Sequence, residues 1–342
     1  MAIALYFQLF IVFLQMYNHR GLLQLAHTQT EYRAMKKVTI LIPCYNEEEA
    51  LPLLADALHK LIDSEPGYEW EVLFVDDGSR DGSVHLLETY HQADSRFCFV
   101  SLSRNFGKEA ALLAGFDYAR GDAVVIMDAD LQHPPGIVPQ MLQAWEEGYA
   151  DVYGRRRDRR KESWLRRRLT LTYYWLLEKS TRVQVLQNVG DFRLLDRRCI
   201  EELRRLRESE RYTKGMYSWI GFKKKELVFD LQDRVAGKSA WNYRQLFALA
   251  IDGISSFSIA PLRVSTLVGV VVSIAAFLYM CKVLIKTIFW GDPVQGYSSL
   301  MVVMLFLGGI QLISLGIIGE YLGKTCIEVK NRPVYVVDRY IG

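Results

Sequence analysis

The chain has 342 residues, half of them hydrophobic, and a formal net charge of only +3. This length exceeds that of a usual single domain, so we expect one large domain plus an appended segment. The small net charge does not favour a general nucleic-acid-binding role. Five cysteines are scattered without any C-x-x-C pair, which argues against a zinc site or a disulfide framework and fits a reducing compartment.

Residues 1–34 differ in character from the rest of the chain. Residues 1–16 are apolar, but they lack the basic start and small-residue cleavage site of a signal peptide. They are also short for a membrane span. One interpretation is an extra interfacial anchor. We favour the other, in which Met35 is the natural start and residues 1–34 form an upstream extension outside the core.

From Val38 onward, strands and helices alternate. Short apolar runs predict strands at 38–42, 72–75, 97–102 and 123–127, with helices through 51–61, 86–87 and 110–119. This alternation predicts an α/β domain with a mostly parallel sheet and helices on both faces. The chain has neither a G-x-G-x-x-G fingerprint after the first strand nor a Walker loop. A dinucleotide-binding fold and a P-loop are therefore not supported.

The strand at 123–127 ends in two carboxylates, Asp128 and Asp130. Because ligands bind beyond the carboxyl ends of strands in open α/β sheets, both side chains would present oxygens to one ligand. Paired hard oxygens suit Mg²⁺ or Mn²⁺, which keep part of their coordination shell for a substrate diphosphate. An Asp-Ala-Asp triplet alone also occurs in solvated turns, so the neighbouring motifs decide between the two interpretations.

Polar motifs follow the three preceding strands as well. They are Pro43-Cys44-Tyr45-Asn46-Glu47-Glu48, then Asp76-Asp77-Gly78-Ser79, then Arg104-Asn105-Phe106-Gly107-Lys108. Taken singly, each motif could be a helix cap, a turn or a solvated charge. Together, at successive strand ends, they predict one cleft whose proline and tyrosine faces pack on a base and whose carboxylates accept hydrogen bonds from a nucleoside.

This series of motifs, with Asp-Ala-Asp-Leu-Gln-His-Pro-Pro at 128–135, resembles family 2 glycosyltransferases of the polyprenyl-phosphate type. The similarity is greatest to the bactoprenol glucosyltransferases of O-antigen modification, with dolichol-phosphate mannose synthases and aminoarabinose transferases as relatives. It covers nearly all of residues 35–342. The resemblance implies a GT-A catalytic domain at 35–240, a UDP-sugar donor, Mg²⁺ or Mn²⁺, and undecaprenyl phosphate as the acceptor.

The resemblance also implies roles for individual residues. The metal and diphosphate set would be Asp128, Asp130 and Gln132. The donor-binding residues would be Pro43, Tyr45, Glu47, Asp76, Asp77, Lys108 and Asp128. The catalytic residues would be Asp191, Asp130 and Arg193, although an aspartate such as Asp191 can also serve a turn or a helix cap. No Q-x-x-R-W sequence occurs, which disfavours a processive polysaccharide synthase.

A basic run lies in the middle of the chain, where nine of the fourteen residues from 155 to 168 are Lys or Arg. A solvated loop or a nucleic-acid patch would explain such a run by itself. A lipid phosphate at an anionic membrane surface explains it better, because guanidinium groups bind phosphate oxygens in pairs. By the resemblance, the residues on the acceptor phosphate would be Arg155, Arg166, Arg167 and Arg234.

Two stretches without charge, 264–281 and 298–319, predict a transmembrane hairpin within residues 262–323, because a span needs about 20 residues. Basic residues flank both outer ends, which predicts that the catalytic domain and a tail at 324–342 lie in the cytoplasm. Residues 241–261 predict an amphipathic helix in the membrane interface, with an ordinary core helix as the alternative. The resemblance implies a homo-oligomer, such as a tetramer, in the cytoplasmic membrane.

The sequence therefore predicts transfer of one sugar, glucose from UDP-glucose, to undecaprenyl phosphate, with inversion, for cell-envelope glycan modification. GDP-mannose or a UDP-aminoarabinose derivative is the alternative donor. A lipid-phosphate-binding scaffold without activity is disfavoured by the intact carboxylates. A nucleic-acid binder is disfavoured by the two spans and by the confinement of the basic run to one loop.

Overall fold

The computed structural model describes residues 35–156, 189–209, 211–229, 260–290 and 296–342. Within these residues the α/β domain is built on an eight-stranded sheet of order β7-β5-β6-β4-β1-β2-β3-β8. The strands are β1 (Lys37–Cys44), β2 (Glu69–Asp76), β3 (Phe97–Leu102), β4 (Ala123–Ile126), β5 (Asp151–Arg156), β6 (Val189–Asp196), β7 (Lys224–Phe229) and β8 (Val337–Ile341). The four strands expected from the apolar runs are confirmed, and β1 and β2 extend beyond the predicted ends.

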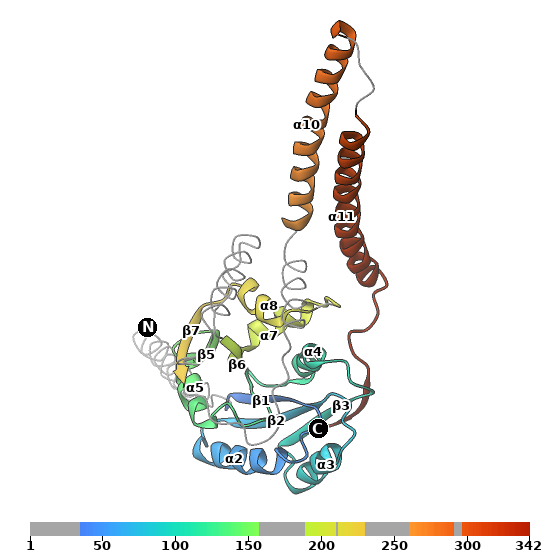
Figure 1. The fold of residues 1–342 in the computed structure, drawn as a ribbon. Helices are drawn as coiled ribbons and strands as arrows, with labels where there is room; N and C mark the ends of the chain where they lie inside the picture. The colour runs from blue at the N-terminus through green and yellow to red at the C-terminus, as the bar shows by residue number, and fades with distance from the viewer. Residues whose placement is uncertain (1–34, 157–188, 210, 230–259, 291–295) are drawn as a thin grey trace, which may run out of the picture.

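Helices cover both faces of this sheet. They are α2 (Leu51–Ser64), α3 (Ser83–Ala93), α4 (Lys108–Tyr118), α5 (Val138–Glu146), α7 (Arg197–Arg205) and α8 (Thr213–Trp219), with a 3-10 turn, η1 (Pro135–Ile137). Buried side chains of α2, α3 and α5 join one hydrophobic cluster, and those of α4, α7 and α8 join a second cluster on the opposite face. The second face lies nearer to the two long C-terminal helices (Figure 1).

The central strands β4, β1, β2 and β3 are parallel, whereas β6 and β8 pair in antiparallel fashion with β4 and β3. The sheet is thus mixed but mainly parallel, as expected for a GT-A domain. The register of β1, β2 and β4 aligns their ends: Cys44 on β1 lies opposite Asp76 on β2, and Leu41 on β1 lies opposite Ile126 on β4. The loops after β1, β2 and β4 therefore leave the sheet at the same edge, where the strand-end motifs were expected to converge.

The last strand, β8, belongs to the segment 324–342, which the sequence presents as a tail. It pairs with β3, and the residues before it are also bound to the α/β domain. Ser103 N–H donates to the Val336 carbonyl at 2.9 Å, and the Tyr335 hydroxyl donates to Asp117 at 2.6 Å. The chain that leaves the hairpin is therefore built into the edge of the eight-stranded sheet.

Two long helices, α10 (Ala260–Trp290) and α11 (Tyr297–Val329), extend away from the α/β domain side by side (Figure 1). They contain the two predicted spans, and Ser265 Oγ lies 2.9 Å from Ser314 Oγ between them. Among the described residues, one stretch, Phe306–Val329, is long and apolar enough to cross a membrane, and Ser265–Tyr279 is a shorter apolar stretch. Residues 1–34 and the proposed interfacial helix up to residue 259 lie outside the described part of the chain.

Candidate active site

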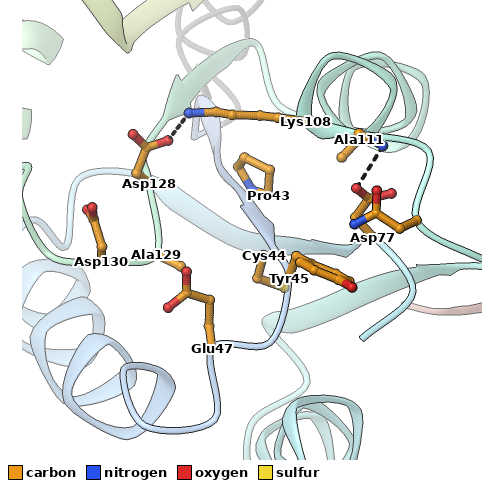
Figure 2. Close-up of a pocket in the computed structure, with 12 residues that line it drawn as sticks. Pro43, Cys44, Tyr45, Glu47, Asp77, Lys108, Ala111, Asp128, Ala129 and Asp130 are labelled. Atoms are coloured by element: carbon orange, nitrogen blue, oxygen red, sulfur yellow. Dashed lines mark hydrogen bonds and ion pairs between the residues drawn. The ribbon is translucent and has the colours of Figure 1, made fainter. Parts of the chain in front are cut away.

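A cavity of about 340 Å³ lies at the carboxyl edge of the sheet. Its lining residues come from all the strand-end motifs: Pro43, Cys44, Tyr45, Glu47, Asp77, Asn105, Gly107, Lys108, Ala111, Asp128, Ala129 and Asp130. Asp128 and Asp130 lie on one side, Asp77 lies on the other, and Pro43 lies between them (Figure 2). The size is within the range of small-molecule sites, and the predicted donor-binding residues, apart from Asp76, meet here.

The loop that carries Asp128 and Asp130 is held by its own hydrogen bonds. The Asp128 N–H donates to His133 Nδ1 at 3.2 Å, and the Gln132 N–H donates to Asp130 Oδ1 at 3.1 Å. The His133 ring is buried and stacks on Phe192 at 4.7 Å between ring centroids. A buried histidine from the same motif thus holds the backbone of Asp128, and the Gln132 N–H holds Asp130; neither supporting contact was predicted from the sequence.

Lys108, the first residue of α4, joins two carboxylates from different elements. Its Nζ lies 2.5 Å from Asp128 Oδ1 and 3.1 Å from Asp191 Oδ2. Burial alone would raise the pKa of Asp128, but the Lys108 ammonium, with smaller contributions from His133 and Lys214, outweighs it and lowers that pKa. Burial would lower the pKa of Lys108, whereas the two carboxylates raise it, so the side chain remains a cation.

Asp76 and Asp77, predicted together as donor-binding residues, occupy different environments. Asp77 lines the cavity, and its two oxygens accept the N–H groups of Phe106 and Gly107 at 2.7 and 2.8 Å. Burial raises the pKa of Asp77, and the two hydrogen bonds, which lower it, offset only part of that effect. Asp76 is fully buried, is not among the lining residues, and accepts the Ser101 hydroxyl at 2.8 Å. Asp76 therefore supports the turn, and Asp77 faces the ligand space.

Asp191 and Arg193, the predicted catalytic residues of β6, also differ in their surroundings. Asp191 is 8% exposed and reaches the cavity through Lys108. Arg193 is 2% exposed, its Nη1 lies 3.2 Å from Asp151 Oδ2, and its guanidinium lies 3.6 Å from the centroid of the Tyr217 ring. Because a buried carboxylate and an aromatic face already occupy Arg193, its contacts are those of a supporting residue beneath Asp191.

Two further residues, Glu109 and Tyr217, lie within electrostatic reach of Asp191 and have no role predicted from the sequence. Glu109 follows Lys108 and accepts the Thr213 N–H at 3.0 Å, which joins α4 to α8. Burial raises the pKa of Glu109, and it raises that of Tyr217 strongly. Spacing along the chain carries no signal for these contacts, because Glu109 and Thr213 lie in distant segments.

Only one of the predicted acceptor residues lies in the described part of the chain. Arg155, on β5, is half exposed, and its Nε lies 2.8 Å from Glu226 on β7. Arg166, Arg167 and Arg234 fall within 157–188 and 230–259, outside the described residues.

Asp128 and Asp130 are the side chains suited to a divalent cation. No group of three or more His, Cys, Asp or Glu side chains in the described residues is arranged to hold a metal ion. Two adjacent carboxylates fit Mg²⁺ or Mn²⁺ bound together with a substrate diphosphate, because such an ion takes its remaining ligands from phosphate and water. They do not fit a metal cage made by protein side chains alone.

The comparisons with known proteins agree with this arrangement. Residues 39–204 match the family described as glycosyl transferase family 2, and residues 260–325 match the GtrB C-terminal hairpin. An uncharacterised glycosyltransferase of Synechocystis is 44% identical over 307 residues, which cover 90% of this chain and 96% of that protein. The chain belongs to glycosyl transferase family 2. It is a glycosyltransferase with a GT-A domain and a C-terminal helical hairpin.

One further relative and one solved structure carry more specific names. The SfII prophage-derived bactoprenol glucosyl transferase of Shigella flexneri is 41% identical over 303 residues, 89% of this chain and 98% of that protein. Among solved structures, the glucosyl-3-phosphoglycerate synthase of Mycobacterium tuberculosis in complex with UDP is 20% identical, with a TM-score of 0.43. That match covers 66% of this chain and 80% of the synthase.

Proposed function

We propose that this glycosyltransferase moves a single glucose from UDP-glucose to undecaprenyl phosphate at the cytoplasmic face of a membrane, with inversion at the anomeric carbon. The observation that carries the proposal is the meeting of Asp128, Lys108 and Asp191 beside the cavity at the carboxyl edge of the sheet. The Shigella relative, named a bactoprenol glucosyl transferase, supports both the acceptor and the sugar. The helical hairpin supports a lipid acceptor at a membrane.

The donor nucleoside would bind between Tyr45, Pro43 and Asp77. Tyr45 is 41% exposed at the cavity, so its ring is available to pack on a base. The Asp77 oxygens each accept one backbone N–H and keep a lone pair for a ribose hydroxyl or a base N–H. Glu47 lines the same cavity, whereas Asp76 would act only through the turn that it holds.

Asp128 and Asp130, with Gln132 beside them, would hold Mg²⁺ or Mn²⁺ together with the donor diphosphate. When bound, the cation supplies charge neutralisation for the departing diphosphate. Asp128 and Asp130 would direct the diphosphate to one side of the cavity, opposite Asp77 (Figure 2). The sugar would then lie toward Lys108 and Asp191, where β6 meets α4.

The acceptor phosphate needs no strong general base. Its second pKa is about 6, so it is mostly dianionic near neutrality and attacks as it stands. A phosphate oxygen forms the new bond to the anomeric carbon, the bond from that carbon to the UDP oxygen breaks, and UDP leaves with the electron pair. In-line attack on an α-linked donor gives a β-linked product. Asp191 would align the acceptor, and the basic residues Arg155, Arg166, Arg167 and Arg234 would bind its charge.

The hairpin α10–α11 would span the membrane, with the catalytic domain and β8 on the cytoplasmic side. Arg263 precedes the first apolar stretch, and Lys324, Lys330 and Arg332 follow the second. Four positive charges thus lie at the end that joins the catalytic domain, against two, Lys282 and Lys286, toward the other end. A homo-oligomer, such as a tetramer, would cover part of the exposed apolar surface of the hairpin.

The direct test is transfer of radiolabelled sugar from a panel of UDP- and GDP-sugars to undecaprenyl phosphate by the purified full chain in detergent, with Mg²⁺, Mn²⁺ or EDTA. Labelled lipid from UDP-glucose that requires the metal is the expected result. Label from GDP-mannose or a UDP-aminoarabinose derivative would keep the chemistry and change the sugar. A folded protein that binds the lipid but labels it from no donor would be a scaffold.

Asp130→Asn isolates the role of the carboxylate pair. We expect turnover to fall about 100-fold to 1,000-fold while undecaprenyl phosphate binding persists, because the lost group acts on the donor diphosphate. Asp56→Asn is the matched control, since Asp56 is exposed on α2 and remote from the cavity lining. Equal turnover of the two variants would remove Asp130 from the mechanism.

A further inference from the structure

Lys108 lies between the two carboxylates on which the proposed reaction depends. Asp128 follows β4 and Asp191 lies on β6, and the single ammonium of Lys108 contacts both, at 2.5 and 3.1 Å. The Lys108 side chain is 45% exposed and lines the cavity (Figure 2). The protein therefore already holds a cation against the carboxylate that a divalent ion would need.

A divalent ion and this ammonium compete for the same oxygen. The ammonium occupies Asp128 Oδ1 at hydrogen-bond distance, and a second cation on that carboxylate would lie within a few ångströms of it. Like charges so close repel each other, and the metal would also have to replace the hydrogen bond. The arrangement opposes metal binding when no other anion is present.

We propose that Lys108 is an exchangeable counter-ion: it occupies Asp128 in the donor-free protein, weakens the binding of free divalent cations there, and moves onto the donor diphosphate when metal and donor bind together. The inference rests on the proposed function, in which Asp128 and Asp130 hold the metal. It makes metal binding depend on the donor, so that metal and nucleotide sugar bind as a unit.

The local structure permits this exchange without movement of the backbone. Asp77 accepts the N–H groups of Phe106 and Gly107, which fixes the main chain immediately before Lys108. Lysine carries its ammonium on a flexible four-carbon stem, so the side chain alone can redirect its charge. Ala111, one turn further along α4, also lines the cavity and leaves room for that movement.

Exchange at Lys108 also affects Asp191. The same ammonium neutralises Asp191 Oδ2, while Asp191 Oδ1 is buried without a hydrogen-bond partner among the described residues. When the diphosphate withdraws Lys108, the Asp191 carboxylate loses its neutralising cation and becomes able to bind another cationic group. Donor binding would in this way change the pairing of both carboxylates through one side chain.

The test measures Mn²⁺ binding to the full chain in detergent, with and without UDP. The readout is the electron paramagnetic resonance signal of free Mn²⁺. We expect the wild-type protein to bind Mn²⁺ weakly alone and much more tightly with UDP. Lys108→Met should raise the donor-free affinity about threefold to tenfold, the range between exposed and desolvated ion pairs. The gain caused by UDP should shrink by a similar factor or more.

Two further variants separate direct contact from general charge. Lys214→Met removes a charge that acts on Asp128 without a hydrogen bond to it, so the donor-free affinity should change by less than about twofold. Lys108→Arg keeps the charge and should stay near the wild-type value. Circular dichroism and thermal melting confirm that each variant is folded.

The outcomes are distinct. If Lys108→Met leaves the donor-free affinity unchanged, or changes it no more than Lys214→Met does, the counter-ion role is overturned while metal-dependent transfer stands. If the wild-type protein binds no Mn²⁺ with or without UDP, the metal site of the proposed function fails, and the counter-ion role fails with it.

Discussion

The catalytic domain and the hairpin use apolar residues in opposite ways. In the catalytic domain, Leu41 and Phe74 are almost completely buried between the sheet and its helices. In the hairpin, Leu267 and Leu312 are 65% and 71% exposed. Exposed apolar surface on this scale requires a cover, and a helix that is apolar on all sides is typical of membrane spans. The first region carries its own core, and the second depends on its surroundings.

The largest expected effect comes from a charge placed in the catalytic core. Leu41 is fully buried on β1, and its side chain lies on the face of the sheet that α4 covers. Leu41→Arg should unfold the domain, because an unpaired buried charge costs more than about 4 to 5 kcal/mol, a large part of the stability of a domain. Loss of the thermal unfolding transition is the measurement. A cooperative transition near the wild-type temperature would contradict the assignment of this core.

The same charge in the hairpin should leave the catalytic domain intact. Leu312→Arg places the guanidinium near the middle of α11, where insertion into a membrane becomes less favourable by about 2.5 to 3.5 kcal/mol. We expect a smaller fraction of the chain to resist carbonate extraction from membranes, with an unchanged melting temperature of the catalytic domain in detergent. Leu312→Met is the matched control. Full retention of Leu312→Arg in membranes would count against a span at this position.

Glycine substitutions also distinguish the packed catalytic domain from the hairpin. Gly78 has a φ of +70°, and a Cβ there would lie 2.5 Å from the Arg104 carbonyl carbon, a backbone atom that cannot move aside. Gly78→Ala should therefore destabilise the domain by about 2 to 3 kcal/mol, from backbone strain and steric overlap together. Chemical denaturation measures the loss. A loss below about 1 kcal/mol, close to that of an ordinary surface substitution, would mean that the loop of Gly78 can move away from the loop of Arg104.

Gly309, on α11, is the matched control, because a Cβ there meets nothing within 4 Å. Gly309→Ala should be neutral or slightly stabilising, since alanine favours a helix by about 1 kcal/mol over glycine. A clear loss of stability at Gly309 would instead indicate that a second copy packs against this face of α11, as expected if the protein is a homo-oligomer.

The sequence predicted those parts of the site whose signals are local. Asp128 and Asp130 follow an apolar run directly, so the pattern showed both the strand and the edge at which it ends. The motifs after β1, β2 and β3 met at one cavity because parallel strands share that edge. Strand β6 depends on pairing with β4 and β5, and the ion pair of Asp191 with Lys108 joins residues 83 apart in the chain. A single sequence has no signal for either.

The segment after the hairpin shows the same limit. β8 is short and its partly buried and exposed residues do not alternate, and its pairing with β3 depends on a return of the chain across more than 230 residues. The sequence therefore predicts only a tail at 324–342. Arg193 was likewise assigned to catalysis from the motif alone, whereas its buried partner Asp151 lies on the neighbouring strand β5.

The smallest predicted effect concerns the connection between the two regions. Tyr335, between α11 and β8, donates to Asp117 at 2.6 Å, and Asp117 also binds the Arg207 guanidinium at 2.6 and 2.7 Å. Burial first, and then Asp117, raise the pKa of Tyr335, so the phenol remains a donor at neutral pH. Tyr335→Phe should cost about 1 kcal/mol, the usual net value of one hydrogen bond.

Thermal melting of the full chain in detergent measures that loss, and Tyr118→Phe is the control, since no hydrogen bond of its hydroxyl occurs in the described residues. Asp117 lies near the end of α4, the helix that begins with Lys108. If Tyr335→Phe lowers sugar transfer by more than the loss of folded protein explains, the hairpin acts on the active site through α4. If the fall in transfer matches the loss of folded protein, this contact only fastens the hairpin to the catalytic domain and does not affect catalysis.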